Sequence, residues 1–109
     1  MVTLNDPVYV EAAQALARRM DAAGETLEEA IRHGFRRCLA REPSDKELAA
    51  LNRLFQKTRK RLAETPERAE KLATIPLGPA PEGADTVKLA ALTVVANALL
   101  NLAELTMKR

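Results

Sequence analysis

The sequence offers few residues for nucleophilic or acid–base chemistry. It contains one serine, one histidine and one cysteine, which are Ser44, His33 and Cys38. A nucleophile needs a base within hydrogen-bond reach. Ser44 and His33 lie on opposite sides of Pro43, and the offset of five between His33 and Cys38 places them on different faces of one predicted helix. We therefore predict no catalytic residue and no enzymatic activity for this chain.

The ligand patterns of metal and cofactor sites are missing as well. A zinc site uses about four ligands, mostly Cys and His, and one residue of each cannot supply them. The sequence has no Asp-x-Asp-x-Asp-Gly calcium loop, no glycine-rich phosphate loop and no Cys-x-x-Cys-His haem motif. Glu28 and Glu29 stand at a predicted helix start, where acidic side chains interact favourably with the helix dipole. We predict no metal site and no cofactor in this chain.

Positive charge gathers between residues 32 and 61, although the whole chain has a net charge of only +2. This stretch has ten basic residues against three acidic ones, Glu42, Asp45 and Glu47. The basic residues that we assign to one interaction face are Arg32, Arg36, Arg53, Lys57, Lys60 and Arg61. This face is expected to be solvated or to meet an acidic neighbouring domain. The alternative is contact with nucleic-acid phosphates, but no aromatic residue is interleaved except Phe55, which we assign to the core.

The elements that position these residues are predicted to be helices. Alanine and leucine make up 36 of the 109 residues, against eight valines and isoleucines, which favours helix over sheet. Helix start signals stand at Asp6-Pro7, Thr26–Glu29, Ser44–Glu47, Thr65–Glu67 and Asp85. Prolines and glycines in residues 75–84 predict a flexible surface loop.

The last predicted helix decides the architecture. Residues 89–103 carry no charge, but a membrane span needs about 20 apolar residues, and here extension brings in Lys88 and Glu104. We interpret it as a core helix rather than a membrane span. On the first helix, Val8, Ala12, Leu16 and Met20 are expected to form the buried face. The predicted fold is all-α: a single domain over residues 1–109, with four long helices and one short helix around a central C-terminal helix.

Four polar residues are assigned structural roles. Asn97 and Asn101 lie one turn apart on the last helix and are predicted to be buried amides that fix its register. One candidate partner is the chain entry Leu4-Asn5-Asp6-Pro7, so that Asn5 and Asp6 are the other two structural residues. The alternative is polar recognition of a ligand in a cleft.

Three segments together carry a family resemblance: residues 4–13, 35–43 and 91–102. In order and spacing they resemble the C-terminal helical domain, of unknown function, of large planctomycete-type proteins that often also carry a c-type cytochrome domain. The resemblance extends over nearly the whole chain. The family often has glycine where Ala40 stands, and it usually has an acidic pair where this chain has Ala103 before Glu104.

The resemblance implies a C-terminal module of a longer, exported protein, whose haem domain and signal peptide would lie upstream of this chain. It carries over no catalytic residues. The expected function is therefore that of a non-catalytic structural module that binds the other domains of the parent protein through the basic face or through the open end of the first helix. The alternative is a small standalone nucleic-acid-binding protein, with an enzyme as a third possibility.

Overall fold

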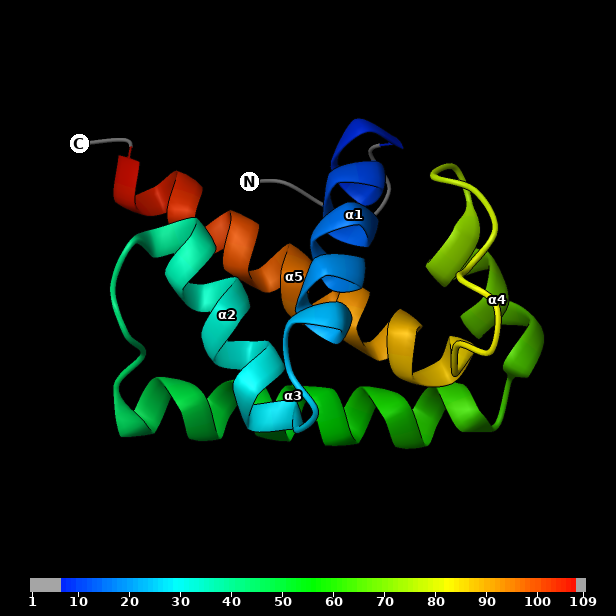
Figure 1. Cartoon of the computed structure of the whole chain (residues 1–109), viewed down its shortest axis with the longest axis horizontal. Coiled ribbons are helices and arrows are strands. Elements are labelled where there is room, and N and C mark those ends of the chain that lie inside the picture. Colours follow the sequence, from blue (N-terminus) through cyan, green and yellow to red (C-terminus); the bar gives the residue numbers. More distant parts are fainter. Residues whose placement is uncertain (1–6, 108–109) are drawn as a thin grey trace.

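The computed structural model describes residues 7–107, and within them the chain forms five helices and no strand (Figure 1). The helices are α1 (Pro7–Ala23), α2 (Leu27–Leu39), α3 (Asp45–Ala63), α4 (Pro66–Thr74) and α5 (Thr86–Met107). Four are long and one is short, and α5 packs against all the others, most extensively against α1. The predicted all-α bundle with a central C-terminal helix is confirmed.

The helix ends follow the start signals of the sequence. Thr26 and Ser44 each accept a hydrogen bond from the backbone N–H three residues later, and Glu29 and Glu47 return the contact, so both capping boxes form. Asp85 accepts from the N–H groups of residues 87 and 88 and caps α5. Thr65 occupies the cap position of α4, but its side chain makes no cap bond, because its backbone departs from the extended conformation of the other two caps.

The core is built from small side chains between a few large ones. Leu89, Leu92, Val95 and Leu99 of α5 are fully buried. Close packing at the α1–α2 contact depends on Gly34, where an added Cβ would lie 2.6 Å from the sulfur of Met20. By length and composition, Thr86–Leu105 of α5 could cross a membrane, and in this fold the segment is the central helix of the bundle.

The predicted buried face of α1 is wrong at Ala12, and the side chain of Val8 lies outside the described residues. Ala12 is exposed, whereas Ala13, Gln14 and Ala17 are fully buried beside the predicted Leu16 and Met20. Alanine lies on both sides of this helix, so its apolar pattern does not select one face. The hydrogen bonds of Gln14, described below, determine which face of α1 is buried.

Helix α2 ends at a residue in the left-handed conformation. Ala40 has φ 56° and ψ 30°, and its N–H donates to the carbonyl of Arg36. Glycine adopts this conformation without the steric cost that a Cβ brings.

Ala40→Gly is therefore expected to raise the free energy of unfolding by about 1 kcal/mol, since it relieves the left-handed strain. Ala50→Gly, at an exposed position inside α3, is the matched control and is expected to lower it by about 1 kcal/mol. Urea denaturation of both variants tests the difference in sign. A loss of stability in Ala40→Gly would contradict it.

Candidate interaction surface

The residues with nucleophilic or ligating side chains are dispersed. Ser44 caps α3, while His33 and Cys38 are half-buried on α2. Burial raises the pKa of the Cys38 thiol, against a lowering contribution from Arg37, so the thiol form is favoured there. Within residues 7–107, no three His, Cys, Asp or Glu side chains are grouped to hold a metal ion.

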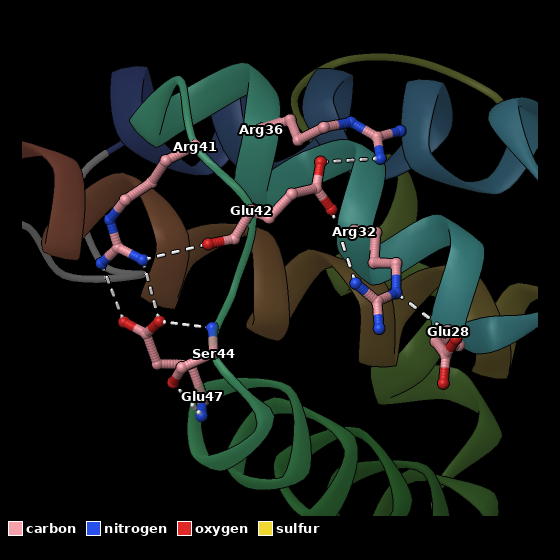
Figure 2. Close-up of polar contacts among 7 residues, drawn as sticks. All are labelled: Glu28, Arg32, Arg36, Arg41, Glu42, Ser44 and Glu47. Carbon is pink, nitrogen blue, oxygen red and sulfur yellow. Dashed lines mark hydrogen bonds and ion pairs between the residues drawn. The ribbon is translucent and has the colours of Figure 1, made fainter.

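The α2 half of the predicted basic face is neutralised by ion pairs (Figure 2). Arg32 lies 3.3 Å from a carboxylate oxygen of Glu28 and 3.4 Å from one of Glu42. Arg36 lies 3.2 Å from the other oxygen of Glu42. Glu42 thus bridges two of the six predicted cations. A partner that approaches α2 meets a mixed-charge surface rather than a purely positive one.

The corner between α2 and α3 is organised by Arg41 (Figure 2). Its guanidinium donates to both carboxylate oxygens of Glu47, at 2.9 and 3.0 Å. It also lies over the ring of Phe35, 4.8 Å from the ring centre, which adds a cation–π contact. Sequence reasoning assigned Arg41 no role, because its partners come from two different helices.

These contacts make the corner sensitive to acid. Hydrogen bonds from Arg41, and then from the backbone of Ser44, lower the pKa of Glu47 to about 2. The pKa of the folded state thus lies below the ordinary value of 4.5. The contribution of this carboxylate to stability is therefore present above about pH 4.5 and is lost as the pH falls toward 2.

The α3 half of the basic face has a different character. Arg53, Lys57, Lys60 and Arg61 are exposed, and in the described part of the chain none of them forms an ion pair. Lys57 and Arg61 line a groove, where Arg68 of α4 joins them. The six residues of the predicted basic face therefore form three pairs. Arg32 and Arg36 are ion-paired on α2, Lys57 and Arg61 line the groove, and Arg53 and Lys60 lie outside it.

The groove lies between α3, α4 and α5 and has a volume of about 450 Å³. Its apolar lining comes from Leu54 and Leu62 of α3, Leu72 of α4 and Val94 of α5. Sequence reasoning did not include Arg68, because the chain has to turn at residues 64–65, so that α4 rises from the end of α3 (Figure 1), before this side chain lines the same groove as Lys57 and Arg61.

A second groove, of about 400 Å³, lies at the end of the bundle where α1, α2 and α5 meet. Small and apolar residues line it, with Arg19 and Arg37 beside them; the apolar ones include Ala12, Leu16, Leu100 and Ala103. The last turns of α5 extend from this end (Figure 1) and carry two exposed leucines, Leu102 at 37% and Leu105 at 68% exposure.

Gln14 and Arg18, one turn apart on α1, hold the end of α4 and the loop that follows. Fully buried Gln14 donates to the carbonyls of Leu72 and Ile75 at 2.6 and 2.8 Å, and it accepts from the N–H of Leu77 at 3.1 Å. Arg18 donates to the carbonyls of residues 73 and 78. The predicted surface loop at residues 75–84 is therefore anchored at its start. A glutamine within an apolar run of α1 is the signal that sequence reasoning missed.

The predicted structural amides are placed only in part. Asn97 and Asn101 are half-buried on α5, and the side-chain oxygen of Asn97 is buried without a hydrogen-bond partner among residues 7–107. The expected partners, Asn5 and Asp6, lie outside the described residues. That Asn97 and Asn101 fix the register of α5, and that Asn5 and Asp6 have structural roles, stays a prediction.

Comparison with known proteins identifies a family without naming an activity. Residues 1–55 match PSD1, a family described as proteins of unknown function (DUF1553). No curated protein and no solved structure matches the chain. The match spans α1, α2 and the first half of α3, and it confirms the resemblance to a domain of unknown function. The chain therefore belongs to the PSD1 family.

Proposed function

We propose that this chain is a non-catalytic helical interaction module of a larger, exported protein. In this proposal it packs against the other domains of that protein through the end of the bundle where α1, α2 and α5 meet. Membership of a family of unknown function is consistent with this role and does not select it. The support comes from the surface at that end.

The observation that carries the proposal is the pair of leucines on the last turns of α5. Leu105 is 68% exposed and Leu102 is 37% exposed, whereas Leu100, on the other side of α5, lines the groove with Leu16. Burial of apolar surface contributes about 25 cal/mol per Å². Large apolar side chains exposed close together on a surface are typical of a protein contact. A neighbouring domain that covers the two leucines would gain this energy.

The charge distribution favours this role over binding of nucleic acid. Arg32 and Arg36 are held by Glu28 and Glu42. A surface for duplex DNA gains most of its affinity from cations that are available to phosphates. The ion pairs leave fewer cations available to phosphates, whereas an apolar contact through Leu102 and Leu105 does not depend on these cations.

Leu102→Glu/Leu105→Glu in the complete natural polypeptide tests the proposal. Two carboxylates in a contact between domains would oppose its burial, so we expect limited proteolysis to separate this domain about tenfold faster. Ile75→Glu is the matched control, because Ile75 is also an exposed large hydrophobic residue, at 62%, but lies on the loop after α4. Equal cleavage rates in the double variant and the parent would contradict the proposal.

A further inference from the structure

The groove between α3, α4 and α5 combines an apolar floor with a positive rim. Leu54, Leu62 and Val94 are among its floor residues, and none of the described residues that line it is acidic. Lys57 and Arg61 of α3 and Arg68 of α4 provide three exposed positive charges, and none of them forms an ion pair within residues 7–107. A complementary ligand must be apolar on one face and negative beside it.

The spacing of the rim identifies the form of that ligand. Lys57 and Arg61 are four residues apart on one helix, so they follow each other along α3 by about 6 Å. Acidic residues at positions i and i+4 of a second helix have the same spacing. We infer that this groove binds an acidic amphipathic helix of a partner protein, with its apolar side chains on the floor and its Asp or Glu side chains at Lys57, Arg61 and Arg68.

Other anionic ligands match the groove less well. A fatty acid has one carboxylate for three cations that come from two helices, and the open groove would leave its chain partly in water. Nucleic acid would use the cations, but the apolar floor contains no aromatic side chain on which a base can stack. An amphipathic helix uses both the apolar floor and the positive rim, because it carries apolar anchors with charged residues beside them.

This inference rests on the proposed role as an interaction module, but it concerns a different face of the bundle. The leucines of the proposed domain contact are on the last turns of α5, whereas Val94 is the α5 residue in this groove. A failure of one contact therefore leaves the other testable.

The first experiment measures binding of a fluorescein-labelled 18-residue helical peptide to the 109-residue chain. The probe has leucine at i, i+3, i+4 and i+7 positions and glutamate on the flanks of that stripe, and a control peptide has lysine in place of each glutamate. We expect the acidic peptide to bind with a Kd of about 10 μM and the basic peptide to bind at least about tenfold more weakly. Equal binding of the two peptides, or no binding of the acidic one, would overturn the inference.

The second experiment locates the site with charge-reversal variants. Lys57→Glu/Arg61→Glu changes the rim, and Arg53→Glu/Lys60→Glu makes the same change of charge on the same helix outside the groove. We expect the rim variant to lose about tenfold in affinity for the acidic peptide and the control variant less than about threefold. Thermal melts confirm that both variants are folded.

Other outcomes of these binding experiments would also overturn the inference. Equal losses in the two variants would overturn the inference in favour of unspecific attraction between charges. Saturable binding of dodecanoate, or salt-sensitive binding of duplex DNA, by a chain that does not bind the acidic peptide would overturn it in favour of a lipid or a nucleic acid.

Discussion

Phe35→Ala is expected to lower the free energy of unfolding by about 4 kcal/mol, the largest single effect that we predict. Phe35 is fully buried on α2, among the largest side chains of the core. Its removal leaves a cavity that the surrounding helices cannot close completely. It also removes the ring on which Arg41 lies at the corner between α2 and α3.

Urea denaturation followed by circular dichroism measures this loss. Phe35→Leu is the matched variant, because it keeps most of the apolar volume, and we expect it to cost about 1 kcal/mol. A loss below about 1 kcal/mol for Phe35→Ala would show that α2 is not packed as described.

Gln14→Met is expected to lower the free energy of unfolding by about 3 kcal/mol. Methionine has a similar length, so the volume is kept while three hydrogen bonds are lost. The carbonyls of Leu72 and Ile75 and the N–H of Leu77 then lose their partner in a part-buried site. A buried polar group left without a partner costs about 1 to 3 kcal/mol.

Gln56→Met is the matched control for this prediction. Gln56 is exposed on α3, and its contact with Asn52 is at the surface, so we expect a change within about 0.5 kcal/mol. Amide hydrogen exchange in the variants adds a local measurement, because loss of the Gln14 contacts should speed exchange at α4 and at residues 75–78. Similar stability of Gln14→Met and the parent would contradict the anchoring role of Gln14.

Local signals in the sequence predicted the helices because the interactions that end a helix are themselves local. Thr26 and Glu29, like Ser44 and Glu47, lie only three residues apart along the chain, so they meet within one helical turn. The central position of α5 followed from its apolar surface, since such a helix has to be covered on most sides.

The interaction surface was less predictable because its charges are set by contacts between elements. The pairing of Arg36 with Glu42 crosses the end of α2, and Arg68 joins the groove only after the chain turns between α3 and α4. The contacts of Gln14 reach about 60 residues along the chain, from α1 to the end of α4. The spacing of residues within one helix does not predict contacts between distant parts of the chain.

The proposal that this chain is a module of a larger protein is tested most directly by the size of the native protein. An antibody against α3 would detect the protein in an extract of its natural source, and mass spectrometry of the captured band would give its sequence coverage. We expect a polypeptide well above the 11.9 kDa of this chain, with additional domains joined to it. A native protein of 11.9 kDa would contradict the proposal, and the exposed cations of α3 would then become the leading indication of function.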